Sequence, residues 1–352
     1  MSPLAPQCSS NETMLDPRRG FLLLFCYNSL NIMAIKEIKT RDLQVKQFIK
    51  EKINEIASTV DGVAINTLSG GVDSSVVTML GHKALGKRLK TYLIDNGLMR
   101  QGEPKRVVAI FKKLGIPVKI VDAKKEFFSA LKGITDPEEK RKAITSTFYK
   151  DVFGKIVRKS KAKYLLQGTN YTDIEETIAG VKRQHNILDQ LGIDTKKEYG
   201  YKLIEPLVQL RKSSVRIVGK TLGLPKNIYN RPPFPGPALA ARVIGEANPE
   251  RIEIVRKATK VVEEELANTD AFQYLAILHE NKVTGVRNGK RDFGLQIEIR
   301  CWESKDAQTG SPTRLPYSIL DKLAKRITQE VKGVVSVTYN ITKKPPSTIE
   351  AV

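Results

Sequence analysis

The sequence predicts an α/β fold, a doubly wound parallel sheet followed by a smaller C-terminal α+β domain. In the first two thirds of the chain, short β-branched apolar runs alternate with segments of helical period, which is the pattern of parallel βαβ units. The alternation stops at residues 231–237, where four prolines in seven residues exclude a regular element. We therefore predict one domain over residues 34–232 and a second over residues 233–352.

The expected elements of the first domain follow in order along the chain. Strands are expected at residues 63–68, 89–94, 118–121 and 164–166, and helices at 38–60, 74–85, 103–114, 125–131, 137–159 and 211–222. From residue 173 to about residue 201 the sequence is charged and irregular, and no element is expected there. In the second domain, helices are expected at 249–267 and 317–331, and strands at 295–302 and 334–341.

Residues 1–33 differ from the rest, because they are loop-like and contain only one apolar run, at 21–27. We expect a disordered extension, or an upstream start codon with Met33 as the natural first residue. Arg18 and Arg19 before the apolar run look superficially like a twin-arginine export signal. The run is short for such a signal, however, and no small-residue cleavage site follows it.

Composition excludes several classes of protein. With 59 Lys and Arg against 38 Asp and Glu, the formal charge of +21 favours phosphate-rich partners, either nucleic acid or nucleotides. The three cysteines are scattered and only three histidines are present, which argues against a disulfide framework, a cysteine zinc site and a His-rich metal centre, and indicates a reducing cytoplasm. No apolar run approaches the roughly 18 to 20 residues that a membrane-spanning helix needs, so we expect no membrane partner.

The most informative motif is Ser-Gly-Gly-Val-Asp-Ser-Ser at residues 69–75, between an expected strand and an expected helix. The two glycines let the backbone turn sharply, and the amides at the start of the helix suit a phosphate. The hydroxyls of Ser69, Ser74 and Ser75 add hydrogen-bond donors, and Asp73 can hold Mg²⁺ against phosphate oxygens. A glycine turn that merely closes a βα unit is the alternative, but the complete motif after an apolar strand favours a phosphate site. The lysine of a Walker A loop is missing.

This motif resembles the PP-loop of the ATP pyrophosphatases, which cleave ATP between the α and β phosphates. Further segments resemble, in order, motifs of one branch, the GMP synthetase family. They are Ile-Asp-Asn-Gly-Leu-Met-Arg at 94–100, Asp-Pro-Glu-Glu-Lys-Arg-Lys at 136–142, Gln-Gly-Thr at 167–169, Arg-Pro-Pro-Phe-Pro-Gly-Pro at 231–237 and Lys-Pro-Pro-Ser-Thr-Ile-Glu at 344–350. The resemblance runs from about residue 35 to the end and is to the ATP pyrophosphatase component in its split, archaeal-type form.

The resemblance implies a ligase of GMP (purine) biosynthesis that forms a C–N bond. Such an enzyme aminates XMP to GMP through an adenyl-XMP intermediate, releasing AMP and pyrophosphate, with Mg²⁺ accompanying ATP. Positioning and charge neutralisation carry this kind of transfer, so no covalent nucleophile is required. Neither Cys8 nor Cys26 lies in the glycine-flanked context of a glutaminase nucleophile. We therefore expect ammonia to come from a separate glutamine amidotransferase subunit.

The resemblance also implies site residues. For ATP they are Ser69, Gly70, Gly71, Val72, Asp73, Ser74, Ser75, Ile94 and Gly168. For XMP they are Arg242, Arg300, Lys344, Thr348, Ile349 and Glu350. The catalytic set is Asp73, which also holds the metal, together with Lys182 and His185 of a mobile lid. In the family, the second domain also forms a homodimer.

The chain departs from the family pattern in two places. Gln184 stands where the lid motif usually has the first of two histidines, and residues 188–191 replace its usual Gly-Gly-Leu-Pro. This puts the role of that first histidine in doubt. The chain also ends in Ala351-Val352 rather than Trp-Glu, so contacts beyond Glu350 can differ.

Three other functions compete with this one. Ammonia-dependent NAD synthetase shares the PP-loop but lacks the motifs at 231–237 and 344–350, and a tRNA-thiolating PP-loop enzyme normally uses paired cysteines, which are absent. A non-enzymatic nucleic-acid-binding protein fits the charge, but the sequence offers no recognition motif or aromatic stacking platform. We expect no nucleic-acid partner, and we expect most of the cations to be solvated, with some forming a docking face for an acidic glutaminase subunit.

Overall fold

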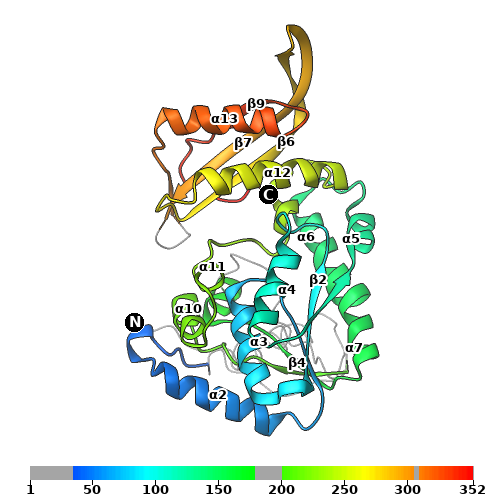
Figure 1. The fold of residues 1–352 in the computed structure, drawn as a ribbon, viewed down its shortest axis with the longest axis vertical. Coiled ribbons are helices and arrows are strands. Elements are labelled where there is room, and N and C mark those ends of the chain that lie inside the picture. Colours follow the sequence, from blue (N-terminus) through cyan, green and yellow to red (C-terminus); the bar gives the residue numbers. More distant parts are fainter. Residues whose placement is uncertain (1–34, 179–199, 305–308, 352) are drawn as a thin grey trace, which may run out of the picture.

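The computed structural model describes residues 35–178, 200–304 and 309–351 and contains two sheets (Figure 1). The first is a five-stranded parallel sheet in the order β3-β2-β1-β4-β5. Its strands are β1 (Ala64–Thr67), β2 (Leu89–Asp95), β3 (Val118–Asp122), β4 (Tyr164–Leu166) and β5 (Lys202–Ile204). The strand order reverses between β1 and β4, which makes this the topological switch point of the sheet. The predicted doubly wound fold is confirmed.

Helices cover both faces of the first sheet. On one face lie α2 (Val45–Thr59), α3 (Val72–Leu85), α4 (Glu103–Lys113), α10 (Lys212–Thr221) and α11 (Lys226–Tyr229). On the other lie α5 (Lys124–Leu131), α6 (Pro137–Ser146), the π-helical turn η3 (Thr147–Phe153) and α7 (Gly154–Ser160). Adjacent strand residues serve opposite faces: Leu93 packs under α3 and α4, whereas Ile94 packs with α5.

Capping residues explain where two of the helices begin. The Asp136 side chain accepts a hydrogen bond from the Glu139 amide at 2.9 Å, and Pro137 occupies the first turn of α6. Asn248 caps α12 (Pro249–Glu265) in the same way, through the Arg251 amide at 3.0 Å. Both helices therefore begin with a capping side chain followed by proline. The capping side chain accepts a hydrogen bond from an amide of the first turn, and proline has no amide hydrogen that would need a partner there.

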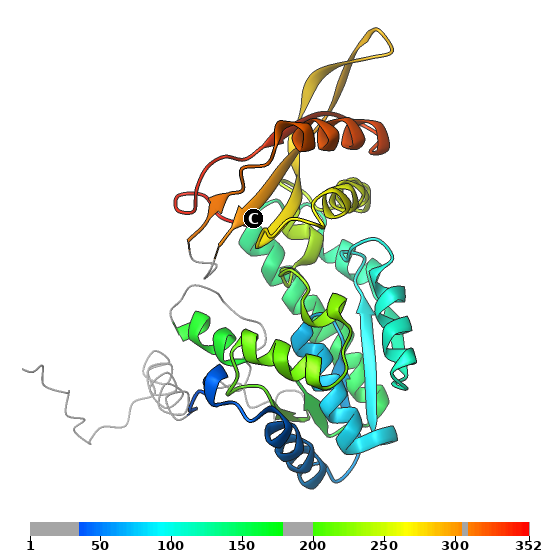
Figure 2. The same cartoon turned by 60° about the vertical axis from the view of Figure 1, so that its left-hand side comes forward.

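The second domain is an α+β unit, as predicted. The strands β6 (Gln273–Arg287) and β7 (Lys290–Glu303) form an antiparallel hairpin, flanked by β8 (Ser311–Pro312) and by β9 (Val334–Tyr339), which runs parallel to β7. The helices α12 and α13 (Tyr317–Glu330) pack against this sheet. The end of the hairpin projects well beyond the rest of the domain (Figure 1 and Figure 2).

One apolar core is shared by the two domains. It begins at Ile94 and Leu98 after β2, continues through Leu239 in the 3₁₀ turn η4 (Ala238–Arg242), and reaches Leu323 and Ile327 of α13. The chain crosses between the domains at the proline-rich segment, and α12 lies between the second sheet and the first domain (Figure 1). The residue at which one domain ends and the other begins stays a prediction. In the described part of the chain, no helix has the length and apolar character needed to cross a membrane.

The remaining described elements were not predicted as such. The short turns η1 (Thr40–Asp42) and η2 (Gly86–Arg88) precede α2 and β2, and α8 (Tyr171–Ile178) follows β4. The strands β5 and β6 were missed, and the helix predicted over 137–159 is divided by η3. The predicted disorder of residues 1–33 concerns a segment outside the described residues.

Candidate nucleotide site

The phosphate loop lies at the switch point, immediately after β1 and before α3. Gly70 adopts a positive φ of 81°, which a residue with a side chain rarely adopts. A Cβ at this position would lie 2.9 Å from Cγ2 of Val107, so space as well as backbone conformation requires glycine. Ligands of open parallel sheets bind in the crevice at the carboxyl ends of strands that flank such a point. The loop is therefore placed where this fold presents a nucleotide.

Hydroxyl groups brace the loop from inside. The Oγ of Ser74 accepts a hydrogen bond from the Ser69 amide at 3.2 Å and lies 2.9 Å from the Ser69 Oγ. The Oγ of Ser75 donates to the Gly71 carbonyl at 2.7 Å. These three serines were predicted as phosphate donors, and in this structure they also fix the shape of the turn.

Asp73 lies in the first turn of α3, beside the loop. Its Oδ1 is buried without a hydrogen-bond partner, and its Oδ2 lies 3.9 Å from Nζ of Lys212. Burial raises the pKa of Asp73, while the positive charges of Lys212 and Arg216 and the amide of Asn170 act in the opposite direction. A cation at the orphaned oxygen would remove this burial penalty.

The unpartnered oxygen of Asp73 is the kind of ligand that a cation carried by a nucleotide would use. The described residues contain no group of three or more His, Cys, Asp and Glu side chains that could enclose a metal by themselves. Mg²⁺ is commonly bound without such an enclosure, by one or two carboxylates, with substrate phosphates and water completing its coordination. Asp73 supplies the carboxylate oxygen that such an arrangement needs.

Gly168, just after β4, packs directly on the phosphate loop. A Cβ there would lie 3.0 Å from the carbonyl carbon of Asp73 and 3.1 Å from the amide nitrogen of Ser74. The structure thus brings Gly168 and the loop together across the switch point, while the role of Gly168 in binding ATP stays a prediction. Ile94 lies at the end of β2 with its side chain buried in the shared core, and its predicted role in binding ATP stays a prediction.

The C-terminal tail forms a second polar cluster, in the second domain. Nε and Nη2 of the fully buried Arg242 donate to the Glu350 carboxylate at 3.3 Å each, and Gln273 donates to the same carboxylate at 2.6 Å. Nη1 of Arg300 donates to the Thr348 carbonyl at 2.7 Å, and its Nε donates to Glu298 at 2.5 Å. The two arginines predicted to bind XMP therefore hold the tail in this structure.

Ile349 anchors the tail from the apolar side, because it is buried against Leu275, Ile277 and Trp302. The Lys344 backbone pairs with Gly310 in both directions, at 2.9 and 3.1 Å, which places it beside β8. The structure brings the predicted residues Arg242, Arg300, Thr348, Ile349 and Glu350 together. Lys182 and His185 lie outside the described residues, and their roles stay predictions.

Several residues at the loop were not predicted. Nη1 of Arg231 donates to the Gly70 carbonyl at 3.1 Å, and its guanidinium is ion-paired with the buried Glu103. Lys212 stands beside Asp73, and the backbone amide of Arg100 donates to Glu103. Arg231 heads the proline-rich motif, which was the available signal, but nothing in the local sequence shows which loop it contacts.

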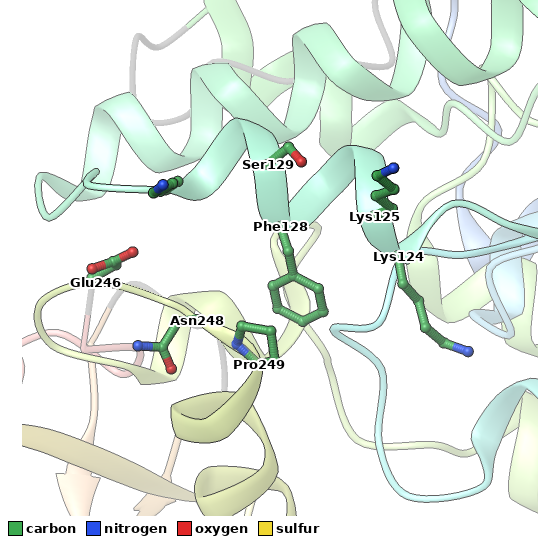
Figure 3. A pocket seen from close by; sticks show the side chains of 8 residues that line it. Lys124, Lys125, Phe128, Ser129, Glu246, Asn248 and Pro249 are labelled. Carbon is green, nitrogen blue, oxygen red and sulfur yellow. The ribbon is translucent and has the colours of Figure 1, made fainter.

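A recess of about 580 Å³ opens where α5 meets the start of α12 (Figure 3). Phe128 and Pro249 face one another in it, while Lys124 and Lys125 point to different sides (Figure 3). Nζ of Lys124 is engaged by Asp95, at 3.0 Å from its Oδ2. The recess is lined by neither the phosphate loop nor the tail, and its lysines do not converge on one point.

A parallel sheet with this loop at its switch point defines the class of PP-loop nucleotide-binding proteins. In agreement, the family model "NAD synthase" matches residues 43–240, and "GMP synthase C terminal domain" matches residues 260–351. A solved NH3-dependent NAD synthetase from Campylobacter jejuni, in complex with the nitrate ion, is similar with a TM-score of 0.43 and 15% identity, over 54% of this chain and 78% of that one.

Curated relatives define the family more narrowly. The chain is 50% identical over 310 residues to the B subunit of the glutamine-hydrolyzing GMP synthase of Archaeoglobus fulgidus, which covers 88% of this chain and 99% of the relative. It is 47% identical to the corresponding protein of Pyrococcus horikoshii, over 86% of this chain and 98% of the relative, and 44% identical to that of Methanocaldococcus jannaschii, over 87% and 98%. The chain belongs to the family of GMP synthase B subunits.

Proposed function

We propose that the chain catalyses the ATP-dependent amination of XMP to GMP, with AMP and pyrophosphate as the other products. The observation that carries the proposal is the phosphate loop at the switch point, with left-handed Gly70 and the unpartnered buried oxygen of Asp73. Membership of the family of GMP synthase B subunits supplies the substrate.

In the first step, the O2 atom of XMP attacks the α-phosphorus of ATP. The bond between O2 and this phosphorus forms, the bond to the bridging oxygen breaks, and pyrophosphate leaves with the electron pair. The backbone amides at the start of α3 would stabilise the departing pyrophosphate, because the serine hydroxyls fix the turn that carries these amides before the reaction. Asp73 would hold Mg²⁺, which when bound neutralises phosphate charge.

In the second step, ammonia attacks C2 of the adenyl-XMP intermediate. The C–N bond forms, the bond between C2 and O2 breaks, AMP leaves, and the protons lost by nitrogen pass to solvent. Neither step needs a covalent bond to the protein, so holding both nucleotides in register is its principal task. The tail held by Arg242 and Arg300 is the proposed XMP side of the site, and Lys182 and His185 are the proposed lid residues.

We further propose that ammonia comes from a separate glutamine amidotransferase subunit in the cytoplasm, which the designation of the relatives as one lettered subunit of a glutamine-hydrolyzing enzyme supports. Part of the +21 charge is proposed to dock that acidic partner, so its binding should weaken as salt is raised. We also propose a homodimer through the second domain. The exposed apolar side chains of Val286, Phe293, Tyr317 and Ile341 support it.

The test is an assay with ATP, Mg²⁺, XMP and ammonium, repeated with glutamine in place of ammonium. We expect GMP, AMP and pyrophosphate with ammonium only. Formation of GMP from glutamine by this chain alone would overturn the need for a partner. ATP cleavage with other acceptors but not with XMP, for example with the acceptor of an NAD synthetase, would overturn the assignment of the substrate.

A further inference from the structure

Three arginines surround the aromatic ring of Phe234, in the proline-rich segment that joins the two domains. The guanidinium carbons of Arg100, Arg242 and Arg231 lie 3.8, 4.7 and 5.9 Å from the ring centroid. Arg100 is 8% exposed and Arg242 is fully buried. A cation over an aromatic face is attracted by the ring, but three neighbouring cations repel one another. A cluster of this kind persists only where carboxylates offset the repulsion.

Carboxylates from both domains offset it. Glu103, at the start of α4, is ion-paired with Arg231 and accepts a hydrogen bond from the Arg100 amide at 3.1 Å. Glu263 of α12 in the second domain is ion-paired with Arg100, and Glu350 of the tail binds Arg242. Burial lowers the pKa of Arg100 to about 10, with Glu263 acting against it. The cluster therefore ties the first domain to α12 and to the tail.

One member of the cluster also holds the phosphate loop. Nη1 of Arg231 donates to the Gly70 carbonyl at 3.1 Å. The same nitrogen and the Glu103 Oε1 each lie 3.4 Å from where a Cβ of Gly70 would stand. The left-handed glycine is thus enclosed on this side by the ion pair of Arg231 and Glu103, residues distant from it in the sequence.

The carbonyl that Arg231 holds controls an amide of the loop. The Gly70 carbonyl and the Gly71 N–H belong to one planar peptide group, so fixing the direction of the first fixes that of the second. Glycines on both sides leave this peptide free to rotate by the dihedrals that flank it. The Gly71 N–H donates only a long hydrogen bond to Ser69 Oγ, at 3.3 Å. The contact from Arg231 is the stronger restraint on its direction.

We propose that Arg231 is a positioning residue for the phosphate loop, held by Glu103 and Phe234, so that the domain junction fixes the orientation of a phosphate-binding amide. Arg231 does not contact the reacting atoms in this account. It acts through the Gly70–Gly71 peptide, and it binds a carbonyl rather than a phosphate. The measurement of kcat depends on the proposed function being correct, whereas the measurement of ATP affinity does not.

The experiment compares Arg231→Gln and Arg231→Lys with the unmodified full chain. For Arg231→Gln we expect about a tenfold weaker Kd for Mg·ATP by calorimetry, and a kcat lower by about ten- to a hundredfold, because an oriented donor is lost. The KM for XMP should change less than twofold. Arg231→Lys should fall between the two, since one amine can reach the carbonyl but has no second nitrogen to pair with Glu103 at the same time.

A chemical rescue separates positioning from a structural role. Adding millimolar guanidinium to Arg231→Ala should restore part of the lost kcat, whereas a loss caused by general destabilisation would grow. Phe234→Leu should weaken ATP binding in the same direction, by about threefold, although Phe234 itself does not touch the loop. Two matched controls should leave ATP binding unchanged: Arg326→Gln, which breaks ion pairs between α12 and α13, and Phe48→Leu, which removes a buried ring beneath Lys52.

Unchanged Mg·ATP affinity in both Arg231→Gln and Arg231→Lys would overturn the inference, as would equal losses for ATP and XMP without guanidinium rescue. If the unmodified chain makes no GMP, the proposed function fails while the calorimetric comparison still decides the inference. If Arg231→Ala does not fold, Arg231→Lys gives the binding result.

Discussion

The side chain of Asp73 is both the proposed cation ligand and a partly buried carboxylate. The proposed function requires its carboxylate to be accessible to a cation that accompanies ATP, yet its Oδ1 is buried and has no hydrogen-bond partner. Burial raises its pKa, which means that the native state favours the protonated form. The stabilising contribution of protonated Asp73 is present at pH values below its ordinary pKa of 3.8, and is lost as the pH rises through its raised native value.

Replacing this carboxylate should separate activity from stability. We expect Asp73→Asn to lower GMP formation by about a hundredfold or more, because the amide cannot replace the charge that balances the pyrophosphate. In the ligand-free protein the same variant should melt at a higher temperature at pH 7, and this gain should vanish as the pH falls toward 4. Calorimetric melts between pH 4 and 8 measure it. A lower melting temperature for Asp73→Asn at pH 7 would contradict the account.

Individual site residues can be predicted from the sequence where they lie close together in one motif. The loop residues and their hydroxyls follow one another within residues 69–75, so their proximity is given by the chain itself. Arg231 and Gly70 are 161 positions apart, and no periodicity or spacing reports a contact over that separation. Lys212 is similar, since it reaches Asp73 only because α10 packs against α3.

Elements with strong periodicity were predicted and irregular ones were not. The strands β1 to β4 and the helices between them carry clear apolar patterns. β5 has only three residues within a charged stretch, and half of β6 lies exposed in the projecting hairpin, where no buried face imposes an alternation. The π-helical turn η3 brings Phe148, Tyr149 and Phe153 together as a group of packed rings, which a helical period does not reveal.

Removing the C-terminal tail should weaken the binding of XMP much more than the binding of ATP. Ending the chain after Ser347 removes the Glu350 carboxylate that Arg242 and Gln273 bind. We expect the KM for XMP to rise about tenfold or more and the Kd for Mg·ATP to change much less, because Glu350 pairs with Arg242 and not with Arg231, which contacts the phosphate loop. Because truncation leaves Arg242 buried and unpaired, Glu350→Gln provides the milder comparison. An unchanged KM for XMP in both variants would remove the tail from the proposed site.

Across the whole molecule, the two domains are joined by a shared core and by buried charge. Lys140 of α6 is 1% exposed, and its Nζ donates to the Val243 carbonyl at 2.8 Å, across the junction. Burial lowers the pKa of Lys140 from 10.5 to about 8. The sequence predicted the order of the domains and the proline-rich connection. The shared core could not be predicted, because its buried members come from residues 94–156 and 238–334, two stretches far apart in the sequence.

The junction lysine should make stability depend on pH. The native pKa of Lys140 is lowered, so between pH 8 and 10.5 the unfolded chain binds more protons and the native state gains stability as the pH rises. Relative to Lys140→Met, the unmodified protein should gain roughly 2–3 kcal/mol over this interval. Urea unfolding of both proteins at pH 7.5, 9 and 10.5 checks the difference. A pH-independent difference would show that the Lys140 amine is not buried at the junction.

The most direct test of the central claim follows one oxygen atom. If O2 of XMP attacks the α-phosphorus of ATP, and ammonia then displaces AMP from C2, that oxygen must end in AMP. With XMP labelled at O2 with oxygen-18, mass spectrometry of the products from ATP and ammonium should find the label in AMP and none in pyrophosphate. GMP formation with unlabelled AMP, or with label in pyrophosphate, would contradict the adenyl-XMP mechanism.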